Sequence, residues 1–104
     1  MGITFIALRC HHGGLISYTL DPHYEGGDLC VFYYVESIGL SVFEMDKLTE
    51  NAGVYGHKVY YGWENNTFRR IDSSRELNGY VKGEVGPTKE VNLYLEVSFH
   101  EILV

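Results

Sequence analysis

The sequence predicts an α+β domain that is mainly antiparallel β-sheet, with about seven strands and one short helix. Short apolar runs, rich in β-branched and aromatic residues, alternate with turn signals along most of the chain. One segment near the middle changes to helical spacing. The 104 residues contain no linker or internal repeat, which predicts a single domain over residues 1–104. A sheet of this width is expected to curl, or to form a barrel or sandwich.

Three strands are expected in the first part of the chain, at residues 3–9, 15–20 and 29–36. The first is apolar on both faces, which is typical of a central strand. Gly13-Gly14 provides the turn before the second strand. Pro22 and Gly26-Gly27 predict a loop over residues 21–27. The third strand contains Tyr33-Tyr34, and adjacent strand residues are expected to point to opposite faces.

A helix is expected at about residues 41–52. Ser41 and Glu44 have the spacing of a capping box, in which each side chain bonds a backbone amide of the first turn. Leu40 and Met45 flank the cap as a hydrophobic staple. Gly53 stands where a left-handed residue ends many helices. The apolar stripe is formed by Val42, Met45, Leu48 and Ala52.

Four further strands are expected, at residues 54–63, 67–72, 80–85 and 91–99. Asn65-Asn66 predicts a hairpin turn between the first two, because Asn tolerates positive φ. Asn78-Gly79 predicts a second turn, and Gly86-Pro87 a third. The last strand alternates strictly, so Leu95 is expected in the core, with the alternate residues in water.

The net charge is −6, and residues 1–57 account for −5 of it. A negative field repels nucleic acid and attracts basic proteins. No apolar run approaches the length of a membrane span. The N-terminus lacks the basic region and the cleavage site of a secretory signal, so a cytoplasmic protein without a membrane segment is expected.

No catalytic or cofactor motif stands out, and neither enzymatic activity nor a cofactor is expected. The adjacent His11-His12 would point to opposite faces of a strand, so no metal site is expected. Cys10 and Cys30 both lie in apolar runs. Buried free thiols are therefore the preferred interpretation, and a disulfide between them is left open.

Nine Tyr side chains are more than a core of this size can bury, so several are expected on a binding surface. We expect a non-enzymatic inhibitor that binds a basic protein, most concretely a bacterial or phage immunity protein that covers the active site of a toxin or nuclease. A small-molecule-binding barrel or sandwich, possibly enzymatic, and a subunit of a larger assembly are the alternatives. The residues expected to bind the partner are Asp21, Tyr24, Glu25, Asp28, Tyr34, Glu36, Tyr61, Trp63 and Glu64.

Overall fold

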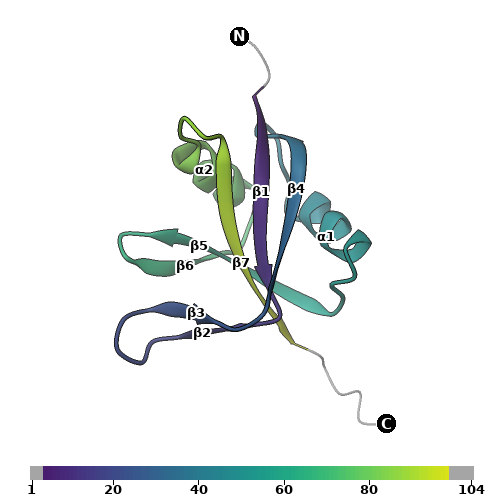
Figure 1. The fold of residues 1–104 in the computed structure, drawn as a ribbon. Helices are drawn as coiled ribbons and strands as arrows, with labels where there is room; N and C mark the ends of the chain where they lie inside the picture. Colours follow the sequence, from purple (N-terminus) through teal and green to yellow (C-terminus); the bar gives the residue numbers. More distant parts are fainter. Residues whose placement is uncertain (1–3, 99–104) are drawn as a thin grey trace.

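The computed structural model describes residues 4–98. Its elements are β1 (Phe5–His12), β2 (Leu15–Ser17), β3 (His23–Glu25), β4 (Asp28–Glu36), α1 (Val42–Asn51), β5 (His57–Glu64), β6 (Thr67–Ile71), α2 (Ser74–Glu84) and β7 (Glu90–Ser98). Five strands form one sheet in the order β4-β1-β7-β5-β6, and β2 pairs with β3 as a separate hairpin (Figure 1). The pair β1–β7 is parallel and the others are antiparallel. The predicted fold class is therefore confirmed. Within it, the main sheet is open, with β4 and β6 at its edges.

One face of the main sheet forms the hydrophobic core, and both helices pack on it. Alternate residues of β1 and β7 are buried, as expected for strands with one face in the core. Met45 comes from α1, and Leu77, Tyr80 and Val81 come from α2. Leu95 is fully buried, as predicted. The sheet residues of this core include Ile6, Leu8, Cys10, Val91, Leu93 and Leu95.

The helix α1 begins where the capping box predicts. The Ser41 hydroxyl accepts a hydrogen bond from the Glu44 amide at 3.0 Å, as predicted. The Glu44 carboxylate accepts a bond from the Ser41 hydroxyl at 3.2 Å, where a bond from the Ser41 amide was expected. Leu40 and Met45 are both buried on either side of the cap. Gly53 has a φ of +91°, as a left-handed residue just beyond the helix should.

Ser41→Ala is expected to lower the free energy of unfolding by about 1 kcal/mol, because the Glu44 amide loses its partner at the start of α1. Chemical denaturation would measure the loss. Ser98→Ala, at the exposed end of β7, is the control and should have little effect. Equal midpoints for the Ser41 variant and the unmodified chain would contradict the capping assignment.

The sequence-based expectation for residues 73–85 is wrong. A turn at Asn78-Gly79 and a strand after it were expected, but this segment forms the second helix, α2. Ser73 caps it by accepting a hydrogen bond from the Glu76 amide at 3.1 Å. Asn78 also holds the helix in place, because its side-chain amide donates to the Leu40 carbonyl at 2.7 Å. This second capping box, followed by apolar residues at helical spacing, was the signal that the Asn-Gly pair obscured.

The hairpin β2–β3 also differs from expectation. The predicted strand over residues 15–20 ends at Ser17, and the predicted loop over residues 21–27 contains β3. The cause is a contact with β7: the Tyr24 hydroxyl donates to the Leu95 carbonyl at 2.7 Å and accepts from the Gly14 amide at 3.0 Å. The strand count of seven within residues 4–98 therefore agrees with the prediction, although the strands are not all the predicted ones.

Candidate functional site

A β-bulge interrupts the edge strand β4. On β1, Ile6 pairs with Val35 and Leu8 pairs with Phe32. Two residues of β4, Tyr33 and Tyr34, therefore stand opposite the single residue Ala7 of β1. Tyr34 adopts a φ of +59°. The two Tyr side chains are 70% and 86% exposed. The expectation that they point to opposite faces is wrong, because the extra residue interrupts the alternation.

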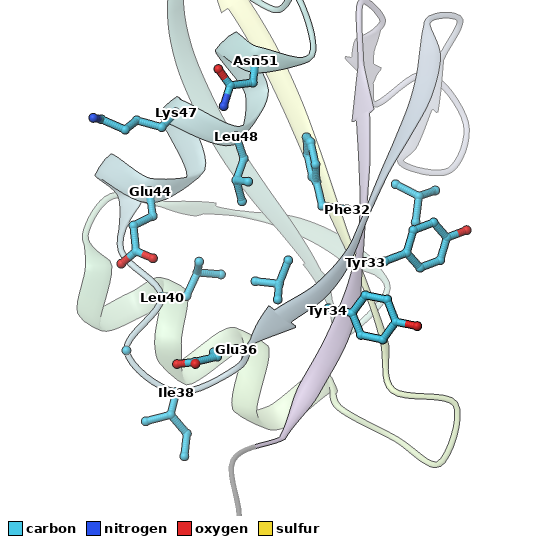
Figure 2. A pocket seen from close by; sticks show the side chains of 13 residues that line it. Phe32, Tyr33, Tyr34, Glu36, Ile38, Leu40, Glu44, Lys47, Leu48 and Asn51 are labelled. Carbon is cyan, nitrogen blue, oxygen red and sulfur yellow. The ribbon is translucent and has the colours of Figure 1, made fainter.

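A groove of about 790 Å³ lies between β4, α1 and the loop that joins them. Figure 2 shows Phe32 and Leu48 between the strand and the helix, with Tyr33 and Tyr34 on the far side of the strand. Leu40 is buried in the joining loop, whereas Ile38 in the same loop is 69% exposed. The groove therefore has an apolar floor and an exposed apolar residue at one end. Its other lining residues are Val31, Val35, Glu36, Gly39, Glu44, Lys47 and Asn51.

The strand and helix that border this groove carry five acidic side chains and one basic one. Two of the acids interact with side chains of β5, and Glu44 accepts the hydrogen bond from the Ser41 hydroxyl. Glu50 lies 3.9 Å from the Lys58 ammonium, and Asp46 accepts a hydrogen bond from the Tyr60 hydroxyl at 2.6 Å. Burial and this bond to Asp46 raise the pKa of Tyr60, which therefore stays a neutral donor.

The other three acids, Asp28, Glu36 and Glu44, form no ion pair within residues 4–98. The one basic side chain, Lys47, lies over the Phe43 ring at 4.9 Å from its centroid. The groove is therefore an apolar surface bordered by uncompensated negative charge.

A second, smaller cleft of about 390 Å³ lies on the other face of the sheet. In Figure 1 the hairpins β2–β3 and β5–β6 extend on one side of the view, and α1 lies on the other. Aromatic rings from both hairpins meet in this cleft. Tyr94 stacks on His11 at 4.5 Å and meets Phe68 edge-on at 5.0 Å. Burial raises the pKa of Tyr94 and of Tyr24. The lining residues are His11, Pro22, His23, Tyr24, Gly26, Trp63, Phe68 and Tyr94.

The predicted binding residues do not form one patch. Glu36 lines the groove beside α1, and Asp28 begins the same strand. Tyr34 also borders the groove, but its ring lies on the far side of β4 (Figure 2). Tyr24 and Trp63 line the aromatic cleft instead. The remaining predicted residues are Asp21 and Glu25 of the β2–β3 segment and Tyr61 and Glu64 of β5.

Two of the predicted acids outside the groove are already paired. Glu25 bonds His23 at 2.7 Å, and Glu64 bonds Arg69 at 3.1 Å. Sequence reasoning missed Ile38, Leu40 and Leu48 as groove residues. The apolar stripe in the sequence predicted that Leu48 lies on the apolar face of α1. It did not predict that β4 packs opposite Leu48.

A family model supplies the deciding comparison. The model of the PB1-like domain matches residues 2–97. The chain belongs to the PB1-like domain family. PB1-like domains bind protein partners and are not typically catalytic. This domain is therefore a protein-interaction module, which agrees with the predicted protein-binding role at the level of class. No curated protein matches the sequence.

The narrower predictions receive no support from the family match. It does not indicate an immunity protein, a toxin or nuclease as partner, or a bacterial or phage source. Within residues 4–98, no helix is long and apolar enough to cross a membrane. In the same part of the PB1-like domain, no three His, Cys, Asp or Glu side chains are grouped so that they could hold a metal ion.

Proposed function

We propose that this PB1-like domain is a non-enzymatic binding module that takes an extended, basic segment of a partner protein along the groove between β4 and α1. The observation that carries the proposal is an exposed edge strand that borders an apolar groove with unpaired carboxylates. Each part of this arrangement supplies a different component of recognition.

The edge strand supplies backbone hydrogen bonds. Among the described residues β4 pairs only with β1, so its other edge is available to an added strand. A strand added there places alternate side chains toward the groove, where Phe32 and Leu48 give apolar contact. The exposed Tyr33 and Tyr34 add rigid amphipathic contact area beside the same strand.

The charges favour a basic segment over a second copy of the domain. If β4 paired antiparallel with β4 of a second copy, centred on Phe32, Asp28 would stand opposite Glu36 at both ends. Like charges directly opposite each other destabilise a strand pair. Lys or Arg at these places would instead be attracted by Asp28 and Glu36, and the acidic surface would accelerate encounter.

A basic toxin or nuclease is one partner with this chemistry. In its most specific version, the proposal is an immunity-type inhibitor that covers the active site of such a toxin or nuclease. The family match supports only the general version, a domain that binds a protein. The aromatic cleft is the specific observation behind a second candidate function, the binding of a small molecule. This alternative assumed a barrel or a sandwich, and within residues 4–98 the main sheet stays open instead of closing into a barrel.

Selection from a random peptide library, followed by amide chemical-shift mapping with a selected synthetic peptide, tests the proposal. We expect peptides in which Lys or Arg alternate with apolar residues, and shifts concentrated on β4 and α1. Ile38→Asp should weaken binding by about tenfold or more, because it places a charge in the apolar end of the groove. Glu36→Gln combined with Glu44→Gln should lower the association rate and its dependence on salt.

Two matched variants outside the groove serve as controls. Leu20→Asp changes an apolar residue that is 96% exposed in the β2–β3 hairpin. Glu90→Gln removes an exposed acid at the start of β7. Equal losses in control and groove variants would contradict the proposed surface. Shifts confined to His11, Trp63 and Tyr94 would favour the small-molecule cleft instead.

A further inference from the structure

The two cysteines of the domain stand directly opposite each other on neighbouring strands. Cys10 on β1 pairs with Cys30 on β4 in the antiparallel ladder. Directly opposed residues point to the same face of a sheet. Because Cys10 belongs to the core beneath the helices, Cys30 lies on that face too. The pairing of β1 with β4 therefore brings together two cysteines that are twenty residues apart in the sequence. Both residues carry free thiols.

This register meets the main geometric demand of a disulfide. Opposed residues of an antiparallel pair have Cα atoms about 4.5 or 5.5 Å apart, depending on their place in the ladder. Disulfides join residues whose Cα atoms are about 4.4–6.8 Å apart. A bond between Cys10 and Cys30 thus requires side-chain rotation and a small approach of two strands that are already paired, without a change of fold.

The two thiols differ in access. Cys10 is 1% exposed, whereas Cys30 is half-buried on the edge strand. Burial and the neighbouring Cys30 raise the pKa of Cys10 to about 12, so Cys10 rests as a protonated thiol. Cys30 is therefore the residue that an external disulfide reaches first, and Cys10 is the internal thiol that follows.

We propose that Cys10 and Cys30 form a thiol–disulfide site, in which a low-molecular-weight disulfide such as oxidised glutathione converts the pair into a cross-strand disulfide between β1 and β4. In the first step the Cys30 thiolate attacks one sulfur of oxidised glutathione. A mixed disulfide forms at Cys30, and one glutathione thiolate leaves and takes up the proton that Cys30 lost.

In the second step Cys10 loses its proton, and its thiolate attacks the Cys30 sulfur. The Cys10–Cys30 bond forms, and the second glutathione leaves as a thiol. The protein loses two hydrogens and two electrons, and oxidised glutathione becomes two molecules of reduced glutathione. The product ties the edge strand to the central strand β1 next to the groove. Reduced glutathione in excess reverses both steps.

The test incubates the full folded chain with mixtures of oxidised and reduced glutathione, followed by acid quenching and intact-mass measurement. We expect a product two hydrogens lighter than the reduced chain, and a thermal midpoint higher by about 10 °C or more. Ring closure should accelerate about tenfold per pH unit below the pKa of Cys10, since only its thiolate attacks.

Single-cysteine variants separate the two steps. Cys10→Ala should accumulate one stable glutathione adduct at Cys30, and Cys30→Ser should react far more slowly because only the buried thiol remains. If Cys10→Ala fails to fold, the Cys30→Ser variant and the mass of the unmodified chain still decide the question. A stable mixed disulfide on the unmodified chain would overturn the proposal. The proposal would also be overturned if the product two hydrogens lighter formed only when the chain was unfolded in denaturant. Neither result depends on whether the groove binds a peptide.

Discussion

Leu95→Ala is expected to lower the free energy of unfolding by about 2–5 kcal/mol. Leu95 lies in the middle of β7, has no exposed surface and stands beside Tyr60 of β5 in the sheet. The truncation removes buried apolar surface and leaves a cavity between the sheet and the helices, which close packing prevents from collapsing fully. Chemical denaturation with far-ultraviolet circular dichroism would measure the loss.

Glu90→Ala is the matched control on the same strand, because Glu90 is exposed at its start. Tyr94 and Glu96 are poorer controls than the alternation of β7 suggests. Tyr94 packs against His11 and Phe68, and Glu96 accepts a hydrogen bond from the Ile16 amide at 3.0 Å. We therefore expect Tyr94→Ala to be destabilising as well. A Leu95→Ala loss no larger than that of Glu90→Ala would show that this strand does not form the core.

Gly62→Ala is expected to destabilise the domain by about 1–3 kcal/mol, which is the usual cost of overpacking a core. A Cβ atom at Gly62 would overlap the Tyr80 ring. That ring cannot easily move, because its hydroxyl donates to the Asn92 carbonyl at 2.7 Å and accepts from the Trp63 amide at 3.1 Å. Thermal and chemical denaturation of the variant would measure the effect.

Gly83→Ala makes the same chemical change but is expected to stabilise the domain. Gly83 lies in α2, and a Cβ atom there meets open space. Ala should therefore stabilise the domain by up to about 1 kcal/mol. In a Tyr80→Leu background the cost of Gly62→Ala should largely disappear, since the ring is gone. An unchanged cost in that background would show that Tyr80 is not what excludes a side chain at residue 62.

Locally encoded features of this PB1-like domain were predictable from sequence. The α1 cap, the left-handed Gly53 and the last strand all follow from residues a few positions apart. The hairpin between β5 and β6 does too, since Asn65 and Asn66 adopt φ values of +51° and +61°. The acidic character of the surface likewise needs only composition.

The sequence by itself therefore determined the fold class, one helix with its cap, and the alternation that buries Leu95. Tertiary structure decided the rest, because it depends on contacts between distant residues. The Ser73 capping box encodes α2 locally, but the hydrogen bond from the Asn78 side chain to the Leu40 carbonyl sets where that helix lies against the loop before α1. Tyr24 bonds β7 and so orders a hairpin where a loop was expected. The bulge at Tyr34 and the approach of α1 to β4 create the groove. The residue pattern along one strand cannot predict which other element packs beside that strand.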